Sequence, residues 1–248
     1  MVCRKTNIAL ISIVGVLLIL AILVLIKVLF ADVKGFEWGS FTDWLSAIGT
    51  FGTFIIAIIA LMKVPDWMVQ KHYDIAYNII ENAVYKDLAD VRSKSLYAKN
   101  LILNLTKNIS YAVRIDGANE ESQSLIEELY KELEVHIDEY HRLTYGIINQ
   151  LQSVSRTNYD VSSYANDIKN FIKKTSDDYN NISVNAFMAF AEYGSHFYTD
   201  QKAKDAFEKE LFDIRHDALK NNTYIRNEIN KVYSENRPIK DFIIRKKK

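Results

Sequence analysis

Cysteine is almost missing from this chain of 248 residues, since Cys3 is the only one, and this excludes both a disulfide framework and a cysteine-based zinc site. With only two prolines and eight glycines, the sequence is neither collagen-like nor a low-complexity linker. An excess of charge is missing as well. The 31 basic and 31 acidic side chains give a net charge of zero, so the total does not point to nucleic acid.

Motifs of catalysis are also missing. The chain has no phosphate-binding loop, no dinucleotide-binding glycine motif and no nucleophile elbow. The nearest approach to a metal site is Glu134, Asp138 and His141, which share one face of a predicted helix. A di-metal centre needs a second helix with a matching Glu-x-x-His motif, and the sequence has none. We therefore expect a solvated acidic helix face there, no metal, no cofactor and no enzymatic activity.

What the chain does have is two long uncharged runs, residues 8–26 and 44–62. About 20 apolar residues are needed to cross the hydrocarbon core of a bilayer. The first run extends to Phe30 if Lys27 reaches the interface from near the helix end, which predicts a span over about 8–30. The alternative is a signal peptide, but its apolar region would be only about 7–15 residues long and would end at a small-residue cleavage site. This run is longer and has no such site.

The second run predicts a span over about 44–62. Ser40 and Asp43 have the spacing of a capping box at its start, and Pro65 follows Lys63, where we expect the helix to end. A buried helix of a soluble protein is the alternative. Tryptophans lie near both ends, as is typical of membrane interfaces: Trp38, Trp44 and Trp67.

The basic residues near the two runs predict their orientation. Arg4 and Lys5 precede the first run and Lys63 follows the second, whereas the short connecting loop carries only Lys34. Because lysine and arginine are retained on the cytoplasmic side, both termini should face the cytoplasm. Residues 1–63 would then form a two-helix transmembrane hairpin in a bacterial inner membrane.

The second run also carries small side chains at steps of three and four residues. Such a stripe lets helix backbones approach closely, and in lipid this packing drives association. It would pack on the first span, join copies of the chain into a homo-oligomer, or do both. The stripe comprises Ser46, Gly49, Thr50, Thr53, Ala57 and Ala60.

Residues 64–236 predict an all-α cytoplasmic domain, an elongated antiparallel bundle, with intermolecular coiled coils as the alternative. Apolar residues at helical spacing predict helices over about 66–114, 120–154 and 200–234. The first stripe begins with Tyr77, Ile80, Val84 and Leu88. Between the second and last helices we expect a helix that starts at a Thr157-x-x-Asp160 capping box, a break over about 175–185, and a short helix over 184–197.

The zero net charge is a sum of unlike parts: +2 over residues 1–63, −7 over 64–236 and +5 over 237–248. Eight acids and one lysine lie within residues 119–140. This run is either a solvated face or a docking surface for a basic cytoplasmic protein, with Glu127, Glu128 and Glu132 as the candidate contacts.

Residues 237–248 form a basic tail. Its last four residues would lie on the anionic cytoplasmic leaflet, where each charge is worth about 1 kcal/mol, with Phe242, Ile243 and Ile244 beside them. Alternatively, the tail would pair with the acidic helix. The four residues are Arg245, Lys246, Lys247 and Lys248.

The sequence WGSFTDWLSAIGTFG at residues 38–52, an apolar stretch, and then VPDW at residues 64–67 lead into a long predicted helix. This arrangement, over about residues 1–75, resembles bacterial accessory-genome membrane proteins, among them two-span effectors that accompany retrons in anti-phage defence. The resemblance implies a cytoplasmic sensor domain held inactive by a partner, and release followed by self-association and permeabilisation of the membrane. The alternative function is a membrane-anchored scaffold or adaptor that binds a protein through its acidic face.

Overall fold

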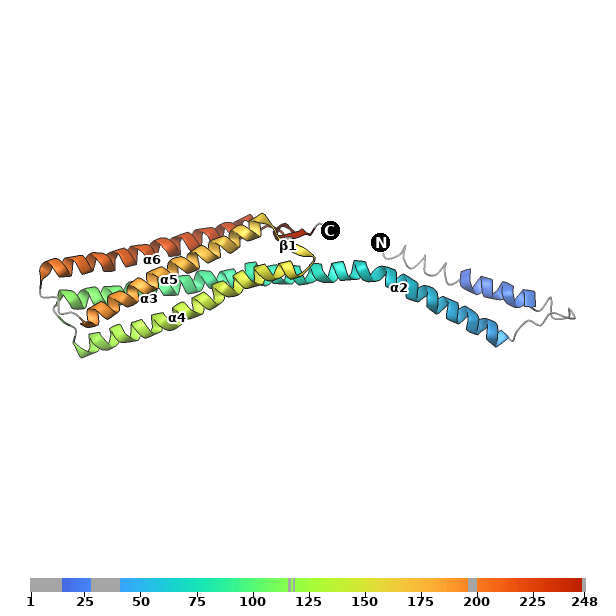
Figure 1. Ribbon diagram of the computed structural model, residues 1–248, viewed down its shortest axis with the longest axis horizontal. Helices are drawn as coiled ribbons and strands as arrows, with labels where there is room; N and C mark the ends of the chain where they lie inside the picture. The colour runs from blue at the N-terminus through green and yellow to red at the C-terminus, as the bar shows by residue number, and fades with distance from the viewer. Residues whose placement is uncertain (1–14, 28–40, 116, 118, 196–199, 247–248) are drawn as a thin grey trace. The chain divides into compact units, whose positions relative to one another are not determined.

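The structure is a computed structural model that describes residues 15–27, 41–115, 117, 119–195 and 200–246. Apart from one pair of three-residue strands, its regular elements are helices, and the all-α prediction is confirmed (Figure 1). The chain divides into two compact units, residues 1–65 and 66–248. Several residues named above lie outside the described part, as do residues 8–14 and 28–30 of the first run: Cys3, Arg4, Lys5, Lys34, Trp38, Ser40, Lys247 and Lys248.

The first unit contains an apolar helix, Gly15–Lys27, and the beginning of α2 (Phe41–Ile80). The expected helix end at Lys63 is wrong, because α2 continues through Pro65 into the second unit. A proline inside a helix removes one backbone hydrogen bond and crowds the preceding turn. The structure keeps the helix in spite of this cost, since the residues on both sides of Pro65 remain helical.

The helical path does not end with α2. It passes through a π-helical segment, η1 (Glu81–Asp87), into α3 (Leu88–Arg114). The predicted end of this helix at Arg114 is confirmed. The π-helical segment was not expected. Tyr77, which begins the predicted apolar stripe, is exposed, whereas its neighbour Ala76 is fully buried.

Two helices start where the sequence predicts and one does not. Helix α4 (Glu120–Ser153) begins after Asn119, whose side chain accepts a hydrogen bond from the Ser122 backbone N–H at 2.9 Å. Helix α6 (Gln201–Glu235) begins after Asp200, which accepts from the Lys202 N–H. The box at Thr157 is wrong, because a 3-10 turn η2 (Val154–Arg156) and strand β1 (Tyr159–Val161) occupy this place.

Helix α5 (Ser163–Ser195) is continuous, so the expected break over 175–185 and the separate helix after it are wrong. Two polar residues within the expected break, Thr175 and Ser183, are buried and bond within the helix. The Thr175 hydroxyl donates to the Ile172 carbonyl at 3.0 Å, and the Ser183 hydroxyl donates to the Asn180 carbonyl at 2.9 Å. A hydroxyl that bonds the preceding turn needs no other partner, and it allows a polar residue inside a helix.

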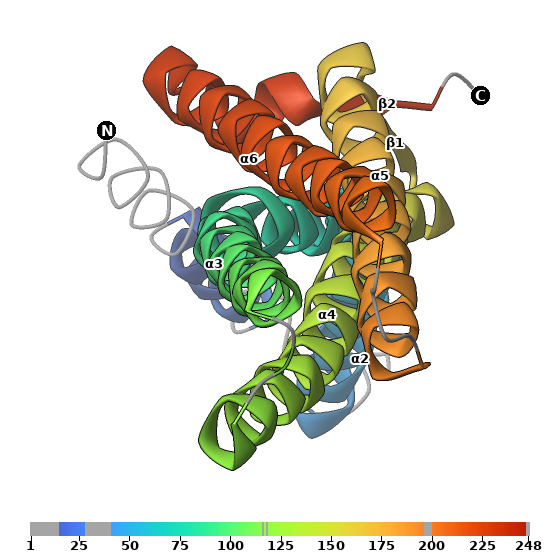
Figure 2. The ribbon, with the colours of Figure 1, turned by 90° about the vertical axis from the view of Figure 1, so that its left-hand side faces the viewer.

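In the second unit, α3, α4, α5 and α6 surround one interior, as Figure 2 shows end-on. Each helix packs against the next, and α6 packs back against α3. The loops between them are short, so successive helices are antiparallel. This confirms bundle-like packing within the chain.

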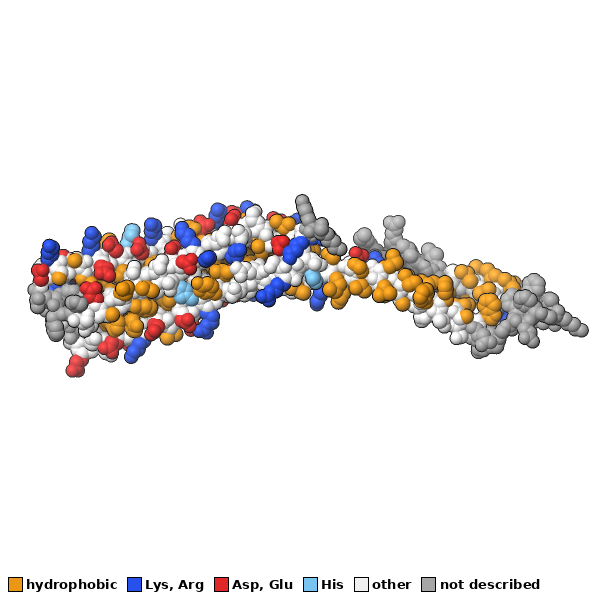
Figure 3. All heavy atoms as spheres, in the orientation of Figure 1, with side chains coloured by type: hydrophobic (Ala, Val, Ile, Leu, Met, Phe, Trp, Pro, Cys, Tyr) orange, Lys and Arg blue, Asp and Glu red, His pale blue; other side chains and the backbone are white. Residues whose placement is uncertain are grey.

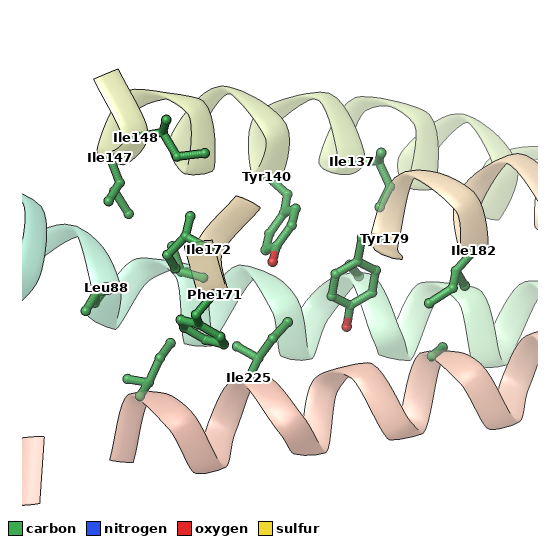
Figure 4. Packing of buried hydrophobic residues seen from close by; sticks show 14 of the residues in the cluster. Leu88, Ile137, Tyr140, Ile147, Ile148, Phe171, Ile172, Tyr179, Ile182 and Ile225 are labelled. Atoms are coloured by element: carbon green, nitrogen blue, oxygen red, sulfur yellow. The ribbon is translucent and has the colours of Figure 1, made fainter. Parts of the chain in front are cut away.

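The interior of the bundle is apolar with a polar layer near its middle. Tyr140 and Tyr179 point into it among isoleucines from the surrounding helices (Figure 4). The Tyr179 hydroxyl donates to the Ser95 carbonyl at 2.9 Å, and the Asn222 amide donates to the Ser95 hydroxyl at 2.7 Å. Burial raises the pKa of Tyr179 to about 12. The layer therefore joins α3, α5 and α6 by bonds that burial strengthens.

The basic tail is part of this unit. After α6, Asn236 adopts a left-handed conformation, and a 3-10 turn η3 (Ile239–Phe242) leads to strand β2 (Ile243–Arg245). Strand β2 pairs antiparallel with β1, with Asp160 opposite Ile244. The expectation that Phe242 and Ile243 rest on lipid is wrong, because both are buried in the bundle core. The described part of the tail, residues 237–246, does not pair with the acidic helix face either, since it packs on β1.

Candidate membrane helix and acidic groove

The apolar stretch of α2 is uncovered in the part of the chain that the structure describes. Its helical path contains a segment long and apolar enough to cross a membrane, and none of this segment is buried. Leu61 is 71 % exposed and Phe51 is 65 % exposed. Figure 3 shows this surface as hydrophobic, whereas the bundle carries mixed charges. A core helix of a soluble protein would be covered, so the exposure disagrees with that alternative.

The small-residue stripe lies on this uncovered surface. Its six residues, from Ser46 to Ala60, all belong to α2 and are all exposed. Two of its hydroxyls are already satisfied inside the helix, since Thr50 donates to the Ser46 carbonyl and Thr53 donates to the Thr50 carbonyl, both at 2.8 Å. A helix face whose hydroxyls bond their own backbone can meet lipid or another helix without leaving a polar group unpaired.

A second feature of the first unit lies on another side of α2. A groove of about 190 Å³ is formed between the helix Gly15–Lys27 and the start of α2, where Trp44, Leu45 and Ile48 line it. At about 100° per residue, these residues centre roughly 150° away from the small-residue stripe. Among the described residues, the stripe is therefore not the surface that meets the first apolar helix.

The acidic candidates meet in a groove of the bundle. Glu127, Glu128 and Glu132 of α4 line an open groove of about 730 Å³. Sequence reasoning missed Tyr97 of α3, because its place in the lining depends on how α3 packs on α4, and the other lining residues belong to α4 itself. The groove also contains Tyr97, Ser124, Lys131, Val135, His136 and Glu139.

Two of the carboxylates in this groove are held by α3. Tyr97 donates its hydroxyl to Glu132, which raises the pKa of Tyr97. Lys94 donates to Glu139 at 2.6 Å, and this hydrogen bond lowers the pKa of Glu139. The His136 ring packs edge-on against Tyr97, with its Nε2 atom 3.0 Å from a backbone carbonyl of α3. These contacts fix one wall of the groove.

The other two carboxylates remain available. Glu127 accepts only from the side chain of Gln123 on its own helix, at 3.1 Å, and Glu128 has no ion-pair partner among the described residues. Val135 adds an exposed apolar side chain between them and the wall. The groove therefore offers negative charge beside an aromatic and an aliphatic surface, a combination that suits a basic segment with apolar residues.

The structure does not bring Glu134, Asp138 and His141 together around one point. Asp138 pairs with Arg142 at 2.8 Å on the surface, while the Nδ1 atom of His141 lies 2.8 Å from the Ser176 hydroxyl in the half-buried seam with α5. Burial lowers the pKa of His141. Within the described residues, no group of three metal-ligating side chains converges.

The described basic residues of the tail are exposed. Arg245 lies in β2 opposite Tyr159, and the Lys246 ammonium is 3.7 Å from the Asp160 carboxylate and donates to the carbonyl of Thr157 at 3.2 Å. In comparisons with known proteins, no protein-family model, no curated protein and no solved structure matches the chain.

Proposed function

We propose that the protein is a non-enzymatic effector of the bacterial inner membrane, with two spans over about 8–30 and 44–62 and both termini in the cytoplasm. The observation that carries this proposal is the uncovered apolar stretch of α2, which continues without a helix break toward the bundle. Leaving a large apolar side chain in water costs about 1.5–3 kcal/mol relative to burial. A stretch of this length therefore needs a lipid environment or another apolar surface.

Self-association through the small-residue stripe would convert this anchor into an effector. The stripe is exposed, its threonine hydroxyls are internally bonded, and it lies away from the groove beside Gly15–Lys27. Close packing of such faces is a main source of helix association in lipid. In the resemblance to anti-phage effectors, a partner holds the cytoplasmic domain inactive, and its release leads to permeabilisation and arrest of growth.

The test is to express the protein alone and to follow membrane potential and growth. We expect loss of potential, and we expect Ala60→Leu, which adds bulk on the stripe, to restore it. Ala47→Leu is the matched control, because Ala47 is also an exposed alanine of α2 but lies about 140° around the helix from Ala60. Normal potential at high expression of the unaltered chain would contradict the proposal.

A second candidate function is a membrane-anchored adaptor, which the groove between α3 and α4 favours. Here the spans only anchor, and Glu127, Glu128 and Glu132 hold a basic protein segment. Combined Glu127→Lys and Glu128→Lys should abolish binding of a labelled lysine- and arginine-rich peptide, measured by fluorescence anisotropy. Glu134→Lys is the control, since Glu134 is exposed on the same helix but does not line the groove. If Glu134→Lys weakens binding equally, the loss comes from net charge and the groove is not the binding site.

A further inference from the structure

The π-helical segment η1 corrects the register of a helix whose buried residues are too widely spaced for an α-helix. Ala76, Ile80, Val84 and Leu88 are four residues apart, and all are 0 % exposed. At about 100° per residue, an α-helix would place Leu88 roughly 120° away from Ala76. A π-turn takes up one additional residue, which removes about 100° of this difference. The four side chains can then share one face.

A purely α-helical path would put a different residue into the core. Tyr77 is eleven residues before Leu88, which is within about 20° of a whole number of α-helical turns. In the structure, however, Tyr77 is 38 % exposed and Ala76 is buried. On the purely α-helical path, burial of Tyr77 would offset the exposure of Ile80, and the half-buried Glu81 would move inward. A second register, one residue away, would exchange Tyr77 for Ala76 in the core, and contacts outside the helix would then favour one register over the other.

Residues 236–246, here called the C-terminal strap, supply such contacts at η1 itself. The Tyr85 hydroxyl donates to the Arg237 carbonyl, and the Tyr85 ring lies edge-on to Phe242 with centroids 6.2 Å apart. Phe242 is 1 % exposed and also packs on Tyr164, at 5.1 Å between centroids. The Arg237 guanidinium lies over the same Tyr164 ring at 4.1 Å. The strap thus holds the side chain at the centre of the π-turn.

The strap also holds α2 just before the π-turn, through β1. Strand β2 pairs with β1, and the Lys246 N–H donates to the Asn158 carbonyl at 3.0 Å. In turn, the Asn158 N–H donates to the His72 Nδ1 atom at 3.1 Å, and Tyr159 packs edge-on against Tyr73 at 5.7 Å. The π-turn and the part of α2 before it are therefore tied to the same C-terminal segment.

We propose that the C-terminal strap is a latch that holds η1 in its π-helical form. When the strap is released, η1 converts to an α-helix, Tyr77 replaces Ala76 in the core, and the part of α2 before Glu81 turns by about 100° about its axis. The latch concerns the bundle alone. Its use as the regulation of a membrane effector rests on the proposed function.

The test reads the register by thiol alkylation of the full chain in detergent micelles, with Cys3→Ser as the background. One protein carries Ala76→Cys and another carries Tyr77→Cys, each with the strap intact or with the chain ended after Asn236. Ending the chain should raise the alkylation rate of the Ala76→Cys thiol about ten-fold or more and lower that of the Tyr77→Cys thiol, because the two positions exchange exposure. Unchanged rates at both positions would overturn the latch.

A third thiol separates a register change from general loosening. Ala98→Cys is the control, because Ala98 is fully buried in α3 beyond the π-turn. Its alkylation should stay slow when the strap is removed. If the Ala98→Cys and Ala76→Cys thiols both become reactive and the Tyr77→Cys thiol does not slow, the strap merely supports the fold and the latch is refuted.

A separate arm tests the link to the membrane. Asp160→Cys with Ile244→Cys places a disulfide across β1 and β2, at a directly opposed and exposed pair. In vesicles of phosphatidylethanolamine and phosphatidylglycerol, the oxidised full-length protein should retain an enclosed dye, and the protein ended after Asn236 should release it. If no dye is released although Ala76 and Tyr77 exchange exposure, the latch stands and the effector function falls.

Discussion

Deleting one residue from η1 should be tolerated, although a deletion inside a helix is usually severe. Asn82 is exposed in the π-turn, and its side chain accepts only a surface hydrogen bond from Lys86 at 2.8 Å. Without Asn82, Ile80 and Val84 become three residues apart, so an ordinary α-helix keeps both facing the core. The matched control is deletion of Asn100, an exposed asparagine of α3 in regular α-helix.

The two deletions should differ by most of the stability of the bundle. Removing Asn100 turns one part of α3 by about 100° against the other. If the part before Asn100 turns, Leu88 and Val91 leave the core together with the residues before them. If the part after it turns, Ile102, Leu105 and Ile109 leave the core. All five named side chains are 0 % exposed. At about 1.5–3 kcal/mol for each large side chain, three or four such residues cost roughly 5–12 kcal/mol. That is comparable to the whole stability of a typical domain, about 5–15 kcal/mol. Deletion of Asn82 moves no buried side chain out of the core.

Guanidinium unfolding in a mild detergent, followed by far-ultraviolet circular dichroism, measures both variants. We expect the Asn82 deletion to unfold within about 1 kcal/mol of the unaltered protein and the Asn100 deletion to lack a cooperative transition. The Asn82 deletion should also keep Ala76 protected after removal of the strap, since no second register remains. Equal damage from the two deletions would refute the register argument.

Three further predictions concern the bundle and share the same unfolding assay. Tyr179→Phe should lower the free energy of unfolding by about 1 kcal/mol, because it removes the buried bond to the Ser95 carbonyl; exposed Tyr145→Phe should change nothing. Asn119→Ala should cost about 1 kcal/mol through loss of the α4 cap, and an unchanged midpoint would contradict that role. Burial lowers the pKa of His141 below its ordinary value of 6.5, so the unfolded chain binds a proton that the folded chain rejects. The contribution of neutral His141 to the free energy of unfolding is intact above about pH 6.5 and is lost as the pH falls below that value. His141→Gln should therefore lose less stability than the unaltered protein between neutral and mildly acidic pH, and parallel curves would refute this.

Helix positions were predictable wherever a regular apolar stripe coincided with a good cap. In α4, Ile126, Leu133 and Ile137 are buried as their spacing predicts, and Asn119 caps the helix. Helix α6 follows the same rule. Both signals are local, because a cap or a helical turn involves residues only three or four positions apart.

The errors arose where polar residues are satisfied by neighbours that the local pattern does not reveal. Thr175 and Ser183 lie in the expected break, yet both are buried and bond the preceding turn of α5. Strands β1 and β2 are three residues each, too short to show alternation, and they pair over about 80 positions of sequence. The π-turn did leave a sequence signal in the successive four-residue steps from Ile80 to Leu88, but only the buried state of Ala76 identified it.

The sequence by itself determined the helical class, the starts of α4 and α6, the uncharged runs and the acidic stretch, because these properties depend on neighbouring residues. The tertiary structure decided the register at η1, the burial of Phe242 and the pairing of the strap with β1. It also decided that Tyr97 of α3 lines the acidic groove and that Lys94 of α3 holds Glu139 there. Each of these outcomes depends on the free energy of contacts between distant segments, which a local pattern does not contain. An apolar residue in the C-terminal tail, for example, has the same local pattern whether it is buried in a protein core or in lipid.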